Sequence, residues 1–260
     1  MIEAVMELSL KMFLIVCPLV FLAGVVDAIG GGGGLISLPA YMLAGLPAKL
    51  AVSTNKLSAS IGTFASTARY VKQGCVDWLT ALPGVAMALI GAYCGANIGL
   101  NLPDKVFEIA LLVVLPVVAA YVLLHRELKK PDKPDLPRAR QIAVVCIVSL
   151  VIGFYDGFYG PGTGTFLILL YTALARMDVL TAGGNTKLSN LASNVMSITV
   201  FLFNGTVLIP LGLTAAVFSI AGHFIGAGIA LKKGAKSIRF VILIVIALLF
   251  AKVIFEMLTK

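Results

Sequence analysis

The sequence predicts an all-α polytopic membrane protein built from two inverted repeats of about five transmembrane segments each, with glycine-broken helices near a central site. Three observations lead to this prediction. The chain is 60% hydrophobic and only 12% charged, whereas soluble domains are nearer a quarter charged. Apolar runs recur along its whole length. The second half of the chain also repeats the first, which indicates an internal duplication.

Short polar breaks divide the chain into ten apolar segments. They cover residues 8–28, 33–46, 49–72, 77–101, 104–124, 139–156, 163–176, 179–203, 207–231 and 236–258. The one long hydrophilic stretch, HRELKKPDKPDLPRAR, begins at His125, and its prolines and mixed charges predict a linker. We therefore expect a single transmembrane domain over 1–260, with a first repeat at 1–124, a cytoplasmic linker at 125–138 and a second repeat at 139–260.

The duplication is visible as motifs that match at a constant offset. IGAYCGANIGL at 90–100 aligns with AGHFIGAGIAL at 221–231. The same offset pairs Gly91 with Gly222, Gly95 with Gly226, Lys56 with Lys187, and Ser58 with Ser189. After a shift of two residues, VVDAIGGGGG meets FYDGFYGPGTG, and Asp27 falls on Asp156. An ordered series of matches over this length indicates duplication rather than chance.

The number of crossings and the distribution of Lys and Arg predict the orientation of the repeats. If all five segments of each half cross, the number is odd and the second half is inverted. This arrangement places most Lys and Arg in cytoplasmic loops, as the positive-inside bias requires. If the short second segment of each half is re-entrant, the halves become parallel and the basic cluster at 232–239 moves outside. The charge distribution therefore favours inversion.

The stretch DAIGGGGGLISLP, from Asp27 to Pro39, places a carboxylate and five glycines between two apolar runs. A phosphate-binding loop is excluded, because no strand precedes the glycines and no Gly-Lys-Ser/Thr follows them. The flanking runs are each about 15 residues, or roughly 22 Å of helix, and the same shortness recurs around Asp156. Such paired short segments predict unwound backbone at Gly30–Gly34 and Gly160–Gly164. The alternative is that the glycines only permit close helix packing.

Lys56 and Lys187 lie well inside apolar segments, where ionisable groups are expensive. Each begins a polar helical face, with hydroxyls following Lys56 and two amides following Lys187. A lysine with such neighbours near helix N-termini is suited to binding an anion. Because the two amides supply more donors, we expect Lys187 to contribute more to anion binding than Lys56. The alternative is that both lysines snorkel to the membrane interface. The candidate substrate-binding residues are Gly30, Gly31, Gly32, Gly33, Gly34, Asn55, Lys56, Ser60, Gly160, Gly162, Thr163, Lys187, Asn190 and Asn194.

Asp27 and Asp156 admit three interpretations, which the sequence leaves open. They are protonatable groups that couple transport to protons, caps for N–H groups freed at the helix breaks, or partners of the two lysines. His125 at the linker edge and His223 in the ninth segment stay outside the expected site. A lone histidine on a helix is more often hydrogen-bonded to a neighbour than a ligand.

Other classes of function find little support. The net charge of +8 is not arranged as a basic stripe with interleaved aromatics, so we expect no nucleic-acid partner. The Gly-x-Gly-Asp and Gly-x-Ser-Gly sequences of intramembrane proteases are absent, so we expect no enzyme. No ATP-binding motif and no cofactor site are expected. A small-anion channel is the alternative to a gradient-driven carrier.

Two longer motifs resemble a known family. DAIGGGGGLISLPAYMLAGLPAKLAVSTNKL in the first half, and GFYDGFYGPGTGTF with GGNTKLSNLASN in the second, resemble the TauE/SafE-type sulfite exporters (TSUP), and within them the YfcA-type transporters. The resemblance covers nearly the whole chain. It implies a multi-pass secondary transporter of small sulfur-containing anions, such as sulfite or sulfonates, in a prokaryotic plasma (inner) membrane. Pro161, Thr163 and Thr165 replace glycine or apolar positions, so identical roles for the two halves are not implied.

Overall fold

The computed structural model describes residues 9–103, 136–238, 240, 241 and 244. Within these residues eight helices have defined bounds, residues 235–238 are also helical, and there is no strand. The helices are α1 (Leu10–Gly30), α2 (Gly34–Leu43), α3 (Ala48–Lys72), α4 (Trp78–Asn101), α6 (Arg138–Phe158), α7 (Thr163–Ala173), α8 (Val179–Phe203) and α9 (Ile209–Lys233). The predicted all-helical class is confirmed. The expected segment at 104–124, nearly all of the linker and most of the segment at 236–258 lie outside the described residues.

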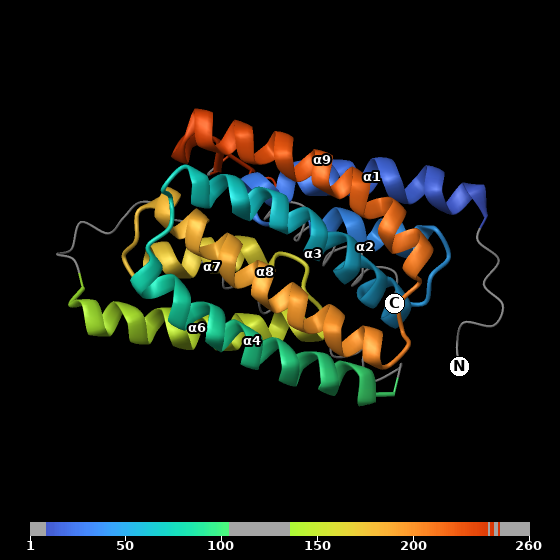
Figure 1. Ribbon diagram of the computed structural model, residues 1–260, viewed down its shortest axis with the longest axis horizontal. Coiled ribbons are helices and arrows are strands. Elements are labelled where there is room, and N and C mark those ends of the chain that lie inside the picture. The colour runs from blue at the N-terminus through green and yellow to red at the C-terminus, as the bar shows by residue number, and fades with distance from the viewer. Residues whose placement is uncertain (1–8, 104–135, 239, 242–243, 245–260) are drawn as a thin grey trace, which may run out of the picture.

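The helices form layers with the polar ones in the middle (Figure 1). Four helices, α1, α4, α6 and α9, are long and apolar enough to cross a membrane. They lie in two outer pairs, α1 with α9 and α4 with α6. Between these pairs lie α3 and α8, which have 25 residues each and bury many polar side chains. The apolar helices therefore enclose a polar centre.

One end of the bundle, named here the Arg138 end, brings together the α3–α4 loop and the beginnings of α6 and α8. Arg138 Nη2 pairs with Asp77 Oδ1 at 2.5 Å. The main-chain N–H of Asp77 donates to Asn185 Oδ1 at 3.0 Å. Gln141 Nε2 donates to the carbonyl oxygen of Ala175 at 2.8 Å, so α7 ends where α6 begins. Helices α6 and α7 therefore form a hairpin that enters and leaves at this end.

The opposite end, named here the Lys49 end, brings together the beginning of α3, the end of α4 and the α8–α9 loop. Lys49 Nζ donates to the carbonyl oxygen of Leu102 at 2.5 Å. The main-chain N–H of Leu208 donates to Thr54 Oγ1 at 3.0 Å. Figure 1 shows α1 beginning and α2 ending at this end. Because α3 begins here and α8 begins at the Arg138 end, the two central helices run in opposite directions.

The two hairpins, α1–α2 and α6–α7, differ from the expectation that every segment crosses the membrane. Helix α2 has 10 residues and α7 has 11. At 1.5 Å per residue these helices are about 15 Å long, roughly half of a hydrocarbon core of about 30 Å. Each short helix therefore returns to the end from which its hairpin started. The whole hairpin, and not its short helix alone, leaves the chain on its starting side, so short second segments do not make the halves parallel.

The two halves interlock through their outer helices. Helix α4 of the first half packs against α6 of the second, and α9 of the second half packs against α1 of the first. A Cβ placed on Gly91 would lie 2.2 Å from the carbonyl oxygen of Leu150, and one on Gly222 would lie 2.2 Å from that of Phe21. Small residues permit helix backbones to approach this closely in membranes. The matched glycines of the duplicated motif thus make equivalent contacts, each with the other half.

Candidate binding site between the two halves

The two chain breaks border the site. Helix α1 ends at Gly30 and α2 begins at Gly34, while α6 ends at Phe158 and α7 begins at Thr163. The non-helical stretches, 31–33 and 159–162, differ by one or two residues from the expected ones. Helical bonding resumes early, since the N–H groups of Ser37 and Phe166 already donate to the carbonyls of Gly33 and Gly162. Gly31, Gly160 and Gly162 have φ of 79°, 99° and 85°, which favour glycine.

The first break is in direct contact with the beginning of α7. Thr165 Oγ1 donates to the carbonyl oxygen of Gly30 at 2.6 Å, and the N–H of Thr165 donates to that of Gly31 at 3.3 Å. A Cβ on Gly31 would lie 2.2 Å from the carbonyl carbon of Gly164. Any side chain at Gly31 would therefore separate the two halves.

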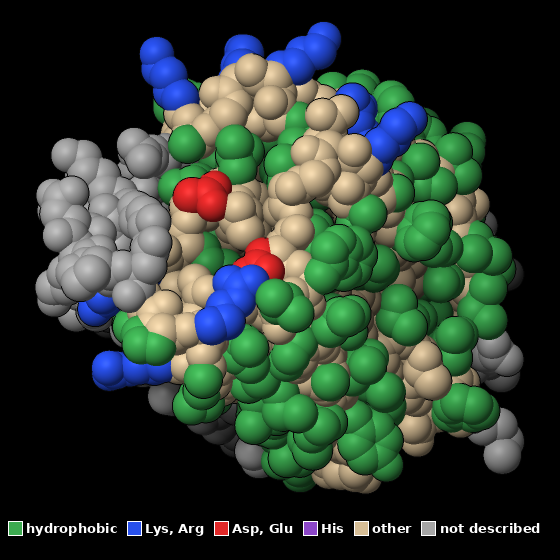
Figure 2. Space-filling view, turned by 60° about the vertical axis from the view of Figure 1, so that its left-hand side comes forward, with side chains coloured by type: hydrophobic (Ala, Val, Ile, Leu, Met, Phe, Trp, Pro, Cys, Tyr) green, Lys and Arg blue, Asp and Glu red, His purple; other side chains and the backbone are tan. Residues whose placement is uncertain are grey.

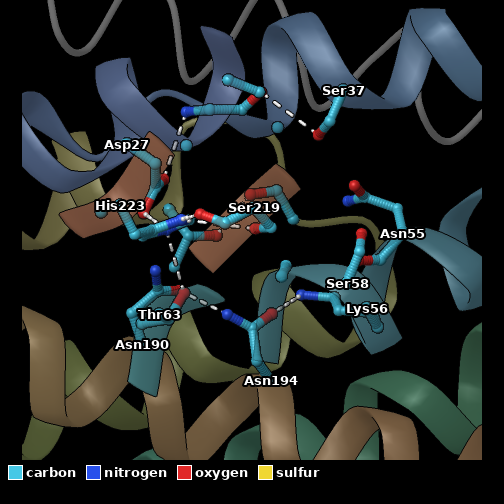
Figure 3. Close-up of a pocket in the computed structure, with 18 of the residues that line it drawn as sticks. Asp27, Ser37, Asn55, Lys56, Ser58, Thr63, Asn190, Asn194, Ser219 and His223 are labelled. Atoms are coloured by element: carbon cyan, nitrogen blue, oxygen red, sulfur yellow. Dashed lines mark hydrogen bonds and ion pairs between the residues drawn. The ribbon is translucent and has the colours of Figure 1, made fainter. Parts of the chain in front are cut away.

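A cavity of about 50 Å³ lies beside these breaks. It is several times the roughly 10–15 Å³ that one water molecule needs, so it has room for a small solute. Its wall comes from both halves, and Figure 3 shows many of its polar side chains. They are Asp27, Ser37, Asn55, Lys56, Ser58, Thr63, Asp156, Thr163, Asn190, Asn194, Ser219 and His223.

Asp156 and Lys56 form a short, buried ion pair in the cavity wall, named here the Asp156 centre. Lys56 Nζ lies 2.7 Å from Asp156 Oδ2 and donates to Asn194 Oδ1 at 2.9 Å. Asp156 also accepts from two hydroxyls, Thr163 Oγ1 at 2.7 Å and Ser193 Oγ at 2.6 Å. Both carboxylate oxygens therefore have close donors.

Asp27 and Lys187 form the second ion pair, named here the Asp27 centre. Asp27 Oδ2 lies 3.3 Å from Lys187 Nζ and 3.3 Å from His223 Nε2. Lys187 Nζ also donates to the main-chain carbonyl of Asp27, and the N–H of Gly33 donates to Oδ1 at 3.2 Å. Figure 3 shows the imidazole of His223 facing the Asp27 carboxylate.

Each ion pair joins the two halves, because each lysine binds the aspartate of the other half. The side chain of Lys187 is fully buried and that of Lys56 is 3% exposed. Neither lysine therefore extends toward the surface, as a snorkelling side chain would. Removing one partner of a buried ion pair leaves an uncompensated charge, so both pairs tie the halves together.

The cavity contains most, but not all, of the residues expected from the sequence. Its wall includes Gly31, Gly33, Gly34, Asn55, Lys56, Gly160, Thr163, Asn190 and Asn194, together with Asp27 and Asp156. The residues of the expected set that are not in the wall are Gly30, Gly32, Ser60, Gly162 and Lys187. Ser60 Oγ donates to the carbonyl oxygen of Lys56 at 2.6 Å, within its own helix. Lys187 contacts Asp27 without lining the cavity.

Sequence reasoning left His223 out of the site, but the structure places it in the wall beside Ser219. Both residues lie on α9, which is otherwise largely apolar. Their spacing of four residues puts them on one helical face. That polar pair on an apolar helix is the signal that could have identified them. The other wall residues outside the expected set include Ser37, Ser58, Thr63 and Gly164.

A bundle of apolar helices around a buried, charged cavity where broken helices meet is typical of membrane transporters. The comparison with known families agrees with this class. The family described as "Sulfite exporter TauE/SafE" matches residues 16–253. The chain belongs to this family.

Curated relatives carry names of the same class. "Probable membrane transporter protein ORF9" of Sinorhizobium sp. is 39% identical over 228 residues, which cover 86% of this chain and 85% of the relative. "Probable membrane transporter protein YfcA" of Escherichia coli K12 is 32% identical over 235 residues, covering 90% and 87%. "Probable membrane transporter protein YunE" of Bacillus subtilis is 24% identical over 274 residues, covering 94% and 98%. No solved structure matches the chain significantly.

Proposed function

We propose that this chain is a gradient-driven secondary transporter of small sulfur-containing anions, such as sulfite or sulfonates. The family description, which names sulfite export, supports the solute class. The observation that carries the proposal is the cavity between the two halves, where Lys56 and several amides meet the beginnings of two short helices.

The donors of the cavity suit an oxyanion. Sulfite and sulfonate groups present three oxygens that accept hydrogen bonds from several directions. Lys56 Nζ and the amides of Asn55 and Asn190 supply donors from α3 and α8. The first residues of α2 and α7, Gly34 and Thr163, also lie in the wall. Helix N-termini carry free N–H groups and the positive end of the helix dipole, which stabilise anions.

We further propose that the halves are inverted repeats within one transmembrane domain. The opposite directions of α3 and α8 support inversion. The exchange of α4 and α9 between the halves supports a single domain, because neither half can bury its outer helix alone. Alternating access then follows from movement of one half against the other around the cavity.

We place the Arg138 end in the cytoplasm of a prokaryotic inner membrane. Figure 2 shows Lys and Arg side chains gathered on this end. Among the described residues, this end holds Arg69, Lys72, Arg138, Arg140, Arg176, Lys232, Lys233 and Lys236, and the Lys49 end holds Lys11 and Lys49. The positive-inside bias supports this orientation.

A small-anion channel is the alternative function. A channel needs an open path, whereas the broken helices here meet in contact at Gly31 and Gly164 beside a small cavity. This contact favours a carrier. A carrier saturates and shows exchange that is stimulated by substrate on the opposite side, and a channel shows neither.

The test is a flux screen in proteoliposomes that contain the purified chain. Sulfite, thiosulfate, sulfoacetate, taurine and methanesulfonate are each offered with and without an imposed pH gradient. We expect saturable, trans-stimulated uptake of at least one of these anions. Flux that rises linearly with concentration and shows no exchange would establish the channel, and no flux of any of them would refute the solute class.

Two lysine variants make the screen specific to the cavity. Lys56→Gln removes the ammonium in the cavity wall and should weaken uptake. Lys72→Gln removes an exposed ammonium near the end of α3 and should not. Equal effects of both variants would mean that the cavity does not bind the anion.

A further inference from the structure

The imidazole of His223 lies in a slot formed by glycines of two other helices. A Cβ on Gly24 of α1 would lie 2.9 Å from Nδ1, and one on Gly62 of α3 would lie 2.6 Å from the same atom. Neither position therefore tolerates a side chain without moving the ring. The His223 side chain is only 4% exposed. The slot fixes the ring with Nε2 directed at Asp27.

The hydrogen-bond partners of the ring define where its protons lie. Nδ1 is 2.9 Å from the carbonyl oxygen of Ser219, which only accepts, and 3.3 Å from the Ser219 hydroxyl; the shorter contact places a hydrogen on Nδ1. Nε2 is 3.3 Å from Asp27 Oδ2 and 3.5 Å from Thr63 Oγ1. A lone pair on Nε2 would face the lone pairs of the carboxylate, which is repulsive. A proton between Nε2 and Oδ2 removes this repulsion, and Lys187 and the N–H of Gly33, which also contact Asp27, stabilise its carboxylate.

The net charge around the cavity differs by one between the state with this proton on His223 and the state without it. The ionisable groups that face His223 or share the described cavity with it are Asp27 on α1, Lys56 on α3 and Asp156 on α6, and Lys187 on α8 pairs with Asp27 from outside the cavity wall. Farther along α3, Arg69 donates to the carbonyl of Phe224 on α9, and Tyr70 donates to that of Ala28 on α1. Two lysines balance two aspartates, so the proton on His223 supplies the one uncompensated charge.

We propose that Asp27 and His223 form the binding site of the coupling proton, and that this proton supplies the charge that accompanies a monovalent anion. The inference rests on the proposed transport function and adds its coupling ion and stoichiometry. With the proton and the anion both bound, or with neither bound, the cavity is neutral. With only one of them bound, a net charge is buried in the membrane, which is expensive. Proton and anion therefore move together.

Only one half contains this site. The duplicated motif has Ala92 at the position that corresponds to His223. Asp156 instead accepts from Thr163, Ser193 and Lys56, and none of these contacts is with a histidine. The structure therefore assigns one proton to each transport cycle.

The first test observes the proton directly and needs no substrate. The chain has two histidines, so a His125→Gln background leaves His223 as the single reporter in NMR of histidine labelled with ¹⁵N. We expect an imidazolium signal near pH 6 with both nitrogens protonated. In that background Asp27→Asn should give the neutral ring with hydrogen on Nδ1 alone. A neutral ring in the parent protein at this pH would overturn the proposal.

The second test measures binding of methanesulfonate, whose charge is constant between pH 5 and pH 9. Because one proton binds with one anion, apparent affinity should fall tenfold for each pH unit once the site formed by Asp27 and His223 has lost its proton. His223→Gln should bind weakly at every pH, because its cavity is always neutral. Asp27→Asn should bind tightly at every pH, because two lysines then face Asp156 alone. The control, His125→Gln, should keep the parent profile.

The two tests separate this proposal from the transport function on which it rests. A His223→Gln protein that keeps the pH dependence of the parent would overturn the proton site while leaving anion transport intact. Failure of every anion in the flux screen would refute the transport function, and the NMR signal would still decide where the proton lies. A destabilised His223→Gln protein does not block the test, because Asp27→Asn should give a flat profile as well.

Discussion

Asp27 and Asp156 precede the two chain breaks at corresponding positions of the duplication, but their surroundings differ. Asp156 accepts from three side-chain donors at 2.6–2.7 Å, and its side chain is 2% exposed. The donors around Asp27 lie at 3.2–3.3 Å, apart from the closer contact of Lys187 with its main-chain carbonyl, and its side chain is 13% exposed. Both copies kept the ion pair between the halves, and only one gained a titratable neighbour.

This difference indicates different roles for the two centres: the Asp156 centre holds helices together, and the Asp27 centre binds the proton. Short charge-assisted hydrogen bonds in a buried place hold their partners firmly, so the Asp156 centre fastens α6 to α3. The looser Asp27 centre is the proposed binding site of the coupling proton. We expect the halves to move about the first centre while the second responds to the proton and the anion.

The largest effect should come from removing the carboxylates one at a time. Asp156→Asn leaves Lys56 buried without an ionic partner, and breaking a buried pair in this way costs about 3–5 kcal/mol. Asp27→Asn should cost less, because Lys187 still donates to the main-chain carbonyl of Asp27. Thermal unfolding midpoints of the two variants in the same detergent measure the difference. Equal losses would show that the two centres are held alike.

The two lysines provide the next comparison. Lys56→Gln should weaken apparent anion affinity by roughly 10- to 150-fold, because a charge-assisted bond contributes about 1.5–3 kcal/mol. Lys187→Gln should weaken it less, since Lys187 contacts Asp27 and is not in the cavity wall. The structure thereby reverses the order that the sequence favours. Concentration series of uptake for both variants, corrected for protein level, decide between the two orders.

A third comparison concerns the packing of the outer helices. Gly91→Ala and Gly222→Ala should each destabilise the protein by about 1–3 kcal/mol, because the added methyl meets a main-chain carbonyl of the other half. Gly183→Ala serves as the control, since its nearest neighbour is a ring carbon of Tyr70 at 3.3 Å. If the α4–α6 and α1–α9 contacts are equivalent, Gly91→Ala and Gly222→Ala should lower the free energy of unfolding by equal amounts in denaturation experiments. Gly183→Ala should lower it less.

The smallest effect on stability should come from single cysteines introduced at the two ends of the bundle, which report the side of the membrane that each end faces. Gln73→Cys and Asn204→Cys lie at exposed, corresponding positions of the two halves, where substitutions usually change stability by less than about 0.5 kcal/mol. A membrane-impermeant thiol reagent should label them from opposite sides. The native Cys75 is a poor reporter of this loop because burial raises the pKa of its thiol. The two cysteines are therefore introduced into a protein from which the native cysteines have been removed. Labelling of both positions from the same side would contradict inversion.

Several parts of the candidate site could be predicted from the sequence because their residue types are unusual in an apolar membrane segment. Asp27, Lys56 and their counterparts are ionisable residues inside apolar segments, and the glycine strings interrupt helices that are too short to cross. The all-helical class followed from the composition and from the apolar runs that recur along the chain. These features are local, so one chain without a structure is enough to find them.

The remaining parts depend on contacts between the halves, which no local pattern contains. The exchange of α4 and α9 decides which lysine meets which aspartate. His223 could not be assigned because its partner, Asp27, lies in the other half. The slot that orients its ring is made by Gly24 and Gly62, which in the sequence are ordinary small residues of two other helices. The sequence also left open whether the short segments 33–46 and 163–176 cross the membrane, because length alone does not show where a short helix ends.

The most direct test of the account follows lumen pH during anion entry. Proteoliposomes with a pH-sensitive dye inside receive an inward methanesulfonate gradient at equal pH on both sides, and labelled methanesulfonate is counted in parallel. The account predicts that the lumen becomes acidic as the anion enters, with about one proton per anion, and that His223→Gln abolishes the coupled acidification. Entry of the labelled anion with no change in lumen pH would contradict it.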